Sequence, residues 1–263
     1  MTDSFYEHLF SVRGKVALVT GGTRGIGLMI AEGLVRAGAR VYVSSRKSDA
    51  CAEAERTLSQ HGDAIAIPSD LGSMAGIEQL ASEIAAREPR LHLLVNNAGL
   101  TWNQPLDEFP EKGWDRVLDL DAKAPFFLSQ KLLPLLRAAA SPSERSVIVN
   151  VSSVNGIKPS GLQNYSYVVA KAGLRQLSAQ MARDLMDDQI NVNVIAPGPF
   201  KSKMTGPMYA TPELDEQARA RFPMKRWGAM EDVAGLTILL ASRAGSYLTG
   251  IEIPCDGGST SIG

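Results

Sequence analysis

Residues 19–34, VTGGTRGIGLMIAEGL, join the end of an apolar run, a glycine-rich loop and the start of an amphipathic pattern. We interpret them as a strand that turns into a helix. Gly21, Gly25 and Gly27 stand where a tight turn and a close approach of backbone to a pyrophosphate require residues without a side chain. The first turn of the helix would direct free N–H groups and its positive dipole end at such phosphates. The stretch therefore predicts a dinucleotide site; glycines that serve only the turn are the alternative.

The rest of the chain repeats this alternation of strand and helix. The expected strands are rich in Val, Ile and Leu, as strands buried on both faces are, and lie near 15–20, 40–44, 64–67, 91–95, 146–151, 190–195 and 250–254. Helical patterns occupy 25–37, 48–60, 74–87, 114–138, 165–187, 212–221 and 230–242. This alternation predicts an α/β fold: a single domain over 1–263 with a doubly wound, seven-stranded parallel sheet of the Rossmann type and helices on both faces. The irregular segment at about 199–229 is expected to form a substrate lid.

The composition argues against several classes of function. The net charge is −1, so no basic field is present to attract nucleic acid or an anionic membrane surface. Cys51 and Cys255 lie far apart and the three histidines are scattered, so we expect free thiols and no metal site. No stretch approaches about 18 uninterrupted apolar residues, and the first residues lack the apolar core of a secretory signal. We therefore expect a cytoplasmic protein.

The end of the second expected strand, VYVSSRK (41–47), indicates which dinucleotide is bound. An acid at this place would accept a hydrogen bond from a ribose 2′-hydroxyl, whereas a 2′-phosphate needs cations. Here Arg46 and Lys47 follow the strand, no acid occurs before Asp49, and Arg24 lies inside the glycine loop. Guanidinium groups can bind a phosphate through charge-assisted hydrogen bonds. The pattern predicts NADP, with solvated surface cations as the alternative.

A second short stretch, NYSYVVAK (164–171), holds two tyrosines and one lysine. On a helix, Tyr167 and Lys171 lie four residues apart and share one face, whereas Tyr165 points elsewhere. Such a pair arises by chance roughly 0.2 times in a chain of this composition. The spacing alone therefore leaves coincidence open, and the pair needs support from other motifs.

Six motifs in this order resemble those of the short-chain dehydrogenase/reductase family, over nearly the whole chain from Lys15 to about Ser259. They are TGGTRGIG (20–27), NNAG (96–99), NVSSVNG (150–156), YVVAK (167–171), NVIAPGPFKS (193–202) and YLTGIEIPCDGG (247–258). Among members of the family, the chain is most similar to 3-oxoacyl-thioester reductases, in particular the subgroup linked to the bacterial rhamnolipid pathway. That finer resemblance includes LLPLLR, INVNVIAPG and MKRWG.

The resemblance implies a catalytic set. Tyr167 corresponds to the acid/base, Lys171 to its activator and Ser153 to the hydroxyl that orients the substrate, whereas Ser152 is expected to serve the strand. The ammonium of Lys171 is expected to favour the phenolate and so to lower the pKa of the phenol. Together with Tyr167 and Lys171, the cofactor residues that the resemblance implies are Gly21, Thr23, Arg24, Gly25, Ile26, Gly27, Arg46, Lys47, Asp70, Leu71, Asn97, Ala98, Gly99, Pro197, Gly198 and Ser202.

One position departs from the family. In VLDLDAKAPFF (117–127), Asp121 stands where the family usually has an asparagine, the fourth member of its catalytic set, which acts through its helix and a water that leads to the lysine. Asp121 either braces its helix without further effect or, as a carboxylate near Lys171, offsets part of the lysine's pull on the phenol.

The resemblance implies an NADPH-dependent ketoreductase that acts on a 3-oxoacyl thioester or a similar apolar ketone, and a homotetramer built on the long helices 114–138 and 165–187. Apolar residues of the lid suit an acyl chain, and plain packing explains them equally well; they are Met204, Met208, Tyr209, Phe222, Met224 and Trp227. An acidic carrier protein would need a basic patch. The end of the active-site helix, RDLMDDQ (183–189), is acidic, and the lid offers Lys201, Lys203, Lys225 and Arg226. The alternatives are a polyol or sugar-acid dehydrogenase of the same family, and a dinucleotide-binding sensor or assembly protein whose catalysis has decayed.

Overall fold

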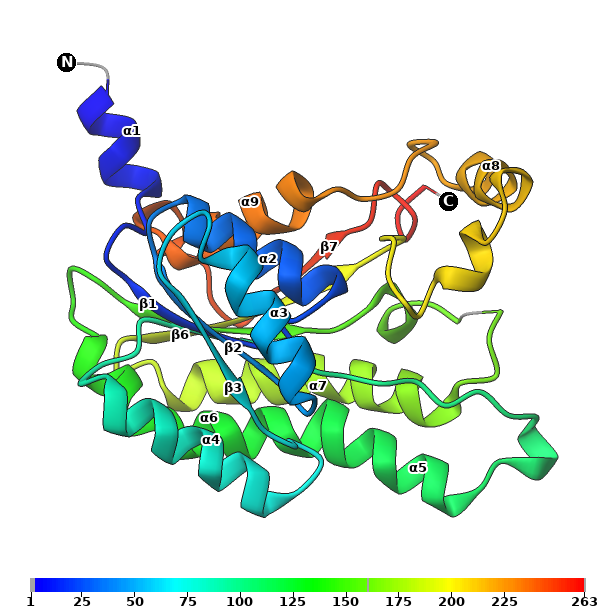
Figure 1. Cartoon of the computed structure of the whole chain (residues 1–263), viewed down its shortest axis with the longest axis horizontal. Helices are drawn as coiled ribbons and strands as arrows, with labels where there is room; N and C mark the ends of the chain where they lie inside the picture. Colours follow the sequence, from blue (N-terminus) through cyan, green and yellow to red (C-terminus); the bar gives the residue numbers. More distant parts are fainter. Residues whose placement is uncertain (1–2, 160, 263) are drawn as a thin grey trace.

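A computed structural model describes residues 3–159 and 161–262 (Figure 1). Its centre is a seven-stranded parallel sheet in the order β3-β2-β1-β4-β5-β6-β7. The strands are β1 Val16–Thr20, β2 Arg40–Ser45, β3 Ala64–Pro68, β4 Leu93–Asn96, β5 Ser146–Val151, β6 Ile190–Pro197 and β7 Glu252–Cys255. The predicted parallel sheet of the Rossmann type is therefore confirmed, and the strand ends lie within two residues of the expected ones.

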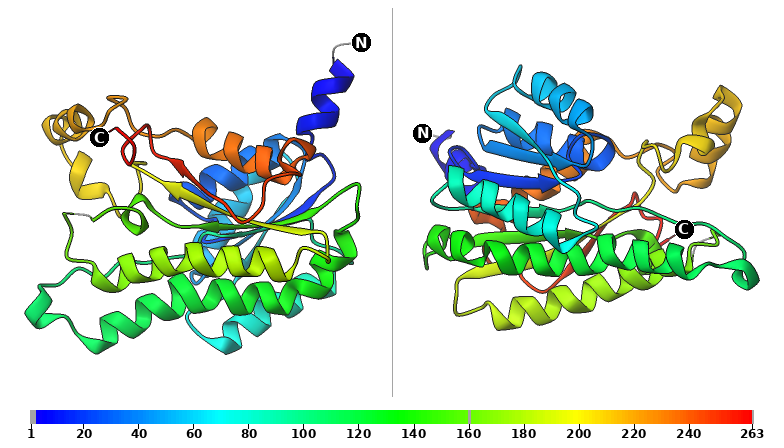
Figure 2. Two further views of the ribbon diagram at one scale, coloured as in Figure 1. Left: turned by 180° about the vertical axis from the view of Figure 1, so that it is seen from behind. Right: turned by 60° about the horizontal axis from the view of Figure 1, so that its bottom comes forward.

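Helices cover both faces of the sheet (Figures 1 and 2). They are α1 Asp3–Phe10, α2 Gly25–Arg36, α3 Ser48–Leu58, α4 Met74–Arg87, α5 Glu111–Leu118, α6 Ala124–Ala139, α7 Tyr165–Asp184, α8 Pro212–Arg221 and α9 Met230–Ala241. One apolar cluster joins α2, α3 and α9 to the sheet, and a second joins α4, α6 and α7 to its other face. Successive strand residues alternate between the two clusters, as the pleat requires: Val19 belongs to the first and Leu18 to the second.

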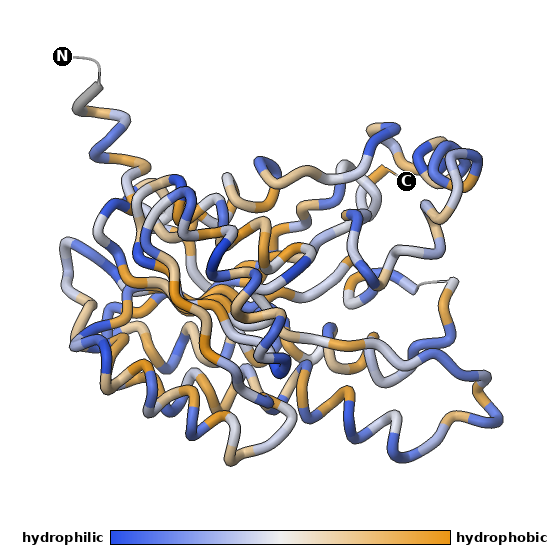
Figure 3. Tube along the Cα trace, viewed as in Figure 1, coloured by the Kyte–Doolittle hydropathy of each residue, from blue (hydrophilic) through white to orange (hydrophobic). Residues whose placement is uncertain are grey.

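The central strands are largely apolar because helices cover both faces of the sheet. The burial of β1, β4, β5 and β6 is complete, and Figure 3 shows the corresponding hydrophobic centre of the molecule. The carboxyl ends of parallel strands meet at one edge of a sheet, so the segments after β1, β4, β5 and β6 are brought together there. No helix in 3–159 or 161–262 is long and apolar enough to cross a bilayer.

The single helix expected over 114–138 is interrupted. Helix α5 begins earlier, at Glu111, and a π-helical turn over Asp119–Lys123 separates it from α6. In this turn the N–H of Ala124 bonds to the carbonyl of Asp119, five residues back. Pro125 has no N–H for the ordinary bond to the carbonyl of residue 121, which accounts for a local change of helical register. The prediction of one continuous helix over 114–138 is therefore wrong. The π-helical turn that interrupts it contains Asp121.

Other differences are smaller. Helix α1 was not expected and projects from one end of the molecule (Figure 1). Helix α7 ends at Asp184, three residues before the expected end. The segment 199–229, here called the lid segment, contains α8 and a short 3-10 helix, Gly206–Tyr209.

Candidate active site

The glycine loop after β1 packs against the loop after β4. Gly21 and Gly25 have φ of 64° and 55°, a region that residues with a side chain rarely adopt. A Cβ on Gly27 would stand 2.5 Å from the carbonyl oxygen of Gly21. The side-chain amide of Asn97 donates to the carbonyls of Thr20 (2.8 Å) and Gly21 (3.3 Å), so Asn97 anchors the glycine loop to the loop after β4. The predicted dinucleotide loop therefore has the backbone shape that close approach to a pyrophosphate requires.

Three cations surround this loop and the end of β2. Arg24, Arg46 and Lys47 are exposed, and none forms an ion pair with another residue in the described part of the chain. Cations left without an internal acid are available to a 2′-phosphate. After β3, Asp70 accepts a hydrogen bond from the N–H of Gly72 (3.1 Å), and Leu71 is buried at the edge of the sheet.

Helix α7 brings Tyr167 and Lys171 together and directs Tyr165 elsewhere. The Nζ of Lys171 lies 5.5 Å from the ring centroid of Tyr167, and both side chains are buried. The ring of Tyr165 instead packs edge-on against Phe109 at 5.5 Å, and Phe109 packs against Trp114 at 6.4 Å. The shared face predicted from the spacing is observed.

The two serines after β5 take different positions. The hydroxyl of Ser153 is close enough to Tyr167 to lower the pKa of its phenol, and it accepts from the N–H of Asn155 at 3.2 Å. The hydroxyl of Ser152 donates to the backbone carbonyl of Lys171 at 3.0 Å. Ser152 therefore ties the strand end to α7, whereas Ser153 faces the phenol.

Asp121 lies in direct contact with Lys171. The carboxylate is fully buried; its Oδ1 accepts from the N–H of Leu100 at 2.9 Å, and its Oδ2 lies 3.2 Å from the Nζ of Lys171. The same Nζ donates to the carbonyl of Val151 at 2.9 Å. A Cβ on Gly99 would stand 2.7 Å from Oδ2, so glycine there makes room for the carboxylate. This ion pair differs from the water-linked arrangement that the resemblance implied for the family's asparagine.

Burial dominates the electrostatics of this cluster. Burial raises the pKa of the Tyr167 phenol; Lys171 lowers it, Asp121 raises it, the hydrogen bond with Ser153 lowers it, and the net pKa is raised. The expected effect of Lys171 is present, but burial outweighs it. Burial lowers the pKa of Lys171, yet the charges of Asp121 and Tyr167 reverse this and leave it raised. Burial also raises the pKa of Asp121, against the opposing effects of Lys171 and the N–H of Leu100.

The segment after β6 crosses the glycine loop. A Cβ on Gly198, which follows Pro197, would stand 2.6 Å from the Cα of Asp256, so the strand end and the C-terminal segment are in close contact. A Cβ on Gly25 would stand 3.3 Å from the Cβ of Ser202. Ser202 therefore lies over the first turn of α2, as a residue that contacts a bound dinucleotide must.

The lid segment has an apolar core of its own. Trp227 packs edge-on against Tyr209 (5.6 Å) and Phe222 (4.9 Å). The Nζ of Lys201 lies over the rings of Tyr209 and Trp227 and pairs with Asp215 at 2.9 Å. These three rings therefore stabilise the segment itself, whereas Met204, Met208 and Met224 remain exposed.

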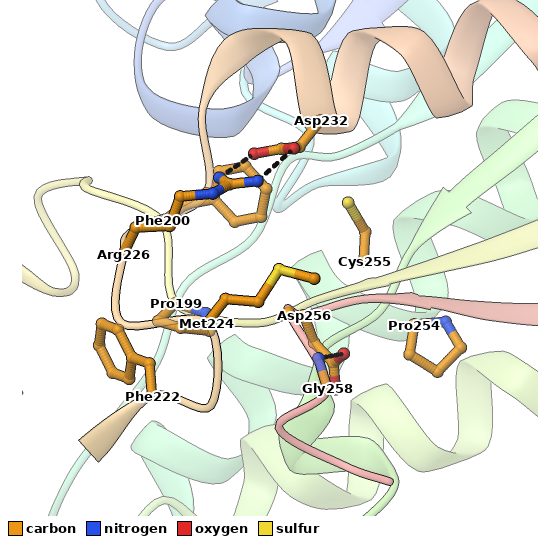
Figure 4. Close-up of a pocket in the computed structure, with 12 residues that line it drawn as sticks. Pro199, Phe200, Phe222, Met224, Arg226, Asp232, Pro254, Cys255, Asp256 and Gly258 are labelled. Atoms are coloured by element: carbon orange, nitrogen blue, oxygen red, sulfur yellow. Dashed lines mark hydrogen bonds and ion pairs between the residues drawn. The ribbon is translucent and has the colours of Figure 1, made fainter. Parts of the chain in front are cut away.

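A pocket lies between the lid segment, α9 and the end of β7 (Figure 4). Its wall includes Phe200, Met224 and Cys255, and the guanidinium of Arg226 pairs with both oxygens of Asp232 at 2.6 and 2.9 Å on its rim. Burial raises the pKa of the Cys255 thiol to about 11. Tyr167, Lys171 and Ser153 are not part of this wall, so the pocket adjoins the lid segment rather than the catalytic cluster.

Some contacts of the site were not expected from the sequence. Leu100 and Trp102 pack on the cluster that contains Tyr167, and Asp256 accepts from the N–H of Gly258 (2.9 Å) and from Thr260. The motif CDGG (255–258) signals the second contact, whereas nothing in the sequence pattern marks the first. Within 3–159 and 161–262, no group of three or more His, Cys, Asp or Glu side chains is arranged to hold a metal ion.

Comparisons with known proteins agree with this arrangement. The family described as enoyl-(acyl carrier protein) reductase matches residues 21–260. A rhamnolipids biosynthesis 3-oxoacyl-[acyl-carrier-protein] reductase from Pseudomonas aeruginosa is 48% identical over 249 residues, which cover 95% of this chain and 97% of that protein. The chain belongs to the short-chain dehydrogenase/reductase family.

A solved structure and a second relative extend these comparisons. A solved structure described as the Pseudomonas aeruginosa RhlG/NADP active-site complex superposes with a TM-score of 0.92 at 48% identity, covering 95% of this chain and 98% of that one. A gluconate 5-dehydrogenase from Gluconobacter oxydans is 33% identical over 262 residues, covering 97% of this chain and 98% of that protein. Close short-chain dehydrogenase/reductase relatives thus include both ketoacyl and sugar-acid enzymes.

Proposed function

We propose that this protein is an NADP-dependent ketoreductase that reduces the keto group of a 3-oxoacyl thioester or a similar apolar ketone. The observation that carries the proposal is the buried cluster in which the Nζ of Lys171 lies 5.5 Å from the ring centroid of Tyr167 and Lys171 and Ser153 both act on the phenol. The 48% identical relative, itself named as a 3-oxoacyl reductase, supports the reaction.

The residues near the glycine loop fit the cofactor. The positive φ of Gly21 and Gly25 and the lack of space for a Cβ on Gly27 suit a pyrophosphate, and the unpaired Arg24 and Arg46 suit a 2′-phosphate. The related structure described as an NADP complex supports the same choice. When bound, the cofactor supplies the hydride.

The side chains supply the proton. A raised pKa keeps Tyr167 protonated at neutral pH, so its phenol can donate to the carbonyl oxygen as the carbonyl carbon is reduced. Ser153 is placed to hold the same oxygen through a second hydrogen bond, which stabilises the charge that develops there. Lys171, anchored by the carbonyl of Val151, keeps a positive charge beside the phenolate left behind.

The charged side chains of the lid segment and of α7 bear on whether a carrier protein or coenzyme A delivers an acyl substrate. Of the lid cations that could form a carrier-docking patch, Lys201 pairs with Asp215 and Arg226 pairs with Asp232. These pairs and the acidic end of α7 support a coenzyme-A-linked or free ketone, whereas the name of the Pseudomonas relative supports a protein carrier. Comparing kcat/KM for one acyl chain on an acyl carrier protein and on coenzyme A separates the two.

A sugar-acid or polyol dehydrogenase is the second candidate, and the gluconate 5-dehydrogenase relative favours it. The exposed Met204, Met208 and Met224 favour the apolar substrate. Turnover assays with NADPH and NADH across 3-oxoacyl thioesters, diketones and keto-sugar acids decide between them. Turnover of the sugar acids alone would replace the first proposal with the second, and no turnover at all would favour a sensor or assembly protein.

We also propose a cytoplasmic homotetramer built on α5–α6 and α7. The exposed apolar side chains of Phe126 on α6 and Val169 on α7 support association through these helices. Light scattering after gel filtration tests the assembly, and cell fractionation tests the location. A monomer at working concentration would contradict the first.

A further inference from the structure

The π-helical turn places a carboxylate whose polar partners, among residues 3–159 and 161–262, are the proposed catalytic lysine and a backbone N–H. Asp121 is fully buried, with its Oδ1 on the N–H of Leu100 and its Oδ2 3.2 Å from the Nζ of Lys171. Asp119 of the same turn instead lies at the surface, where it pairs with Lys123 at 3.1 Å. One turn therefore carries an inward and an outward carboxylate, and only the inward one reaches the catalytic cluster.

Among the described residues, Lys171 alone provides a positive charge that compensates for the carboxylate of Asp121. On α7, the ionisable groups that act on it or on its partner are Lys171 and Tyr167. The charged side chains of α5 and α6, which pack beside the turn, are exposed; they include Asp115, Arg116 and Lys131. The loop after β4 contributes the neutral N–H of Leu100. Among the described charges, one ammonium and one carboxylate therefore act on Tyr167, in addition to the larger effect of its burial.

We propose that Asp121 is a positioning residue that neutralises the Lys171 ammonium and so holds the transferable proton on Tyr167, which moves the pH ranges of ketone reduction and alcohol oxidation upward. An asparagine at this place would leave the ammonium uncompensated and its pull on the phenol stronger. The inference rests on the proposed function, because it concerns the proton donor of the same site.

This pH dependence follows from the proton balance of the reaction. In reduction, hydride forms the new C–H bond, the π electron pair of the C=O bond moves to oxygen, and that oxygen takes the proton from the Tyr167 O–H. The phenolate that remains must regain a proton from solvent before the next turnover. Alcohol oxidation requires the phenolate at the start, so a higher proton affinity at Tyr167 moves both the rise of oxidation and the fall of reduction to more alkaline pH.

The test compares wild type, Asp121→Asn and Asp119→Asn. The matched control removes a carboxylate from the same turn, but one that is paired at the surface. The pH dependence of kcat/KM is measured for ketone reduction and for oxidation of the product alcohol. In Asp121→Asn, the alkaline fall of reduction and the rise of oxidation should both move to lower pH, and the fraction of Tyr167 present as phenolate at neutral pH should rise about tenfold for each unit of displacement. Asp119→Asn should superimpose on wild type.

A second readout needs no turnover. Tyr167 is titrated by the difference in tyrosinate absorbance between each protein and its Tyr167→Phe counterpart, without cofactor or ketone. A titration midpoint of Tyr167 that is lower in Asp121→Asn than in wild type supports the inference. An unchanged or higher midpoint overturns it, even if the enzyme reduces ketones as proposed. Conversely, if wild type turns over no ketone or alcohol, the proposed function is wrong. The titration then still decides whether Asp121 raises the proton affinity of Tyr167. If Asp121→Asn does not fold, Asp121→Ser, which also removes the charge, is measured with the same expectations.

Discussion

The Nζ of Lys171 lies 3.2 Å from the Oδ2 of Asp121, and both side chains are buried. Breaking a buried ion pair leaves an uncompensated charge, which costs about 3–5 kcal/mol. We therefore expect Lys171→Met to lower the free energy of unfolding by about that amount at neutral pH, unless Asp121 takes up a proton. Urea unfolding measures the loss, and the double variant Lys171→Met/Asp121→Leu should recover most of it.

The same variant should respond to pH in a defined direction. Burial already raises the pKa of Asp121 and loss of the ammonium raises it further, so the folded protein binds the proton more tightly than the unfolded chain. The stabilising protonation is complete below the unfolded pKa of about 3.9 and is lost as pH rises through the folded value. The deficit of Lys171→Met relative to wild type should therefore shrink in acid. A deficit that stays constant with pH would contradict this.

The cations near the glycine loop predict cofactor preference. Arg24→Ala/Arg46→Ala should raise KM for NADPH at least about tenfold, because hydrogen bonds to a charged group contribute about 1.5–3 kcal/mol each, and should change KM for NADH little. Arg116→Ala, which removes an exposed arginine from α5, is the matched control. If wild type prefers NADH in kcat/KM, the role given to these cations is wrong.

His92 predicts a pH-dependent stability far from the site. Its Nδ1 accepts from the N–H of Val16 at 3.0 Å, and burial lowers the pKa of its imidazole, with Lys15 adding to the effect. The unfolded chain therefore takes up a proton first, and the free energy of unfolding should fall as pH drops below about 6.5. His92→Asn keeps an acceptor without a titrating group. The free energy of unfolding of His92→Asn should therefore lack the fall in acid that His92 causes in wild type. Identical pH profiles in the two proteins would show that His92 does not titrate as described.

The sheet and much of the site could be predicted because they depend on local pattern. Near-continuous Val, Ile and Leu in 91–95 and 146–151 indicates strands covered on both faces, and the spacing of Tyr167 and Lys171 specifies one helix face. The glycine loop was predictable because its backbone shape excludes a Cβ.

What could not be predicted depends on contacts between distant segments. The apolar pattern runs through 114–138, so the π-helical turn is visible only once Asp121 is seen to meet Leu100 and Lys171. Composition likewise could not tell that Trp227 packs within the lid segment while Met224 stays exposed. Nor could the sequence show that burial outweighs the effect of Lys171 on the pKa of Tyr167.

The most direct test of the proposed ketoreductase is the pair Tyr167→Phe and Tyr165→Phe, assayed with NADPH and a 3-oxoacyl thioester. The first removes the transferable proton beside Lys171, whereas the second removes a hydroxyl from a ring packed on Phe109. Loss of a general acid lowers kcat by about 10²–10⁴-fold, and we expect that loss in Tyr167→Phe with NADPH binding retained, against a nearly unchanged Tyr165→Phe. Equal losses in the two variants, or full activity in Tyr167→Phe, would contradict the account.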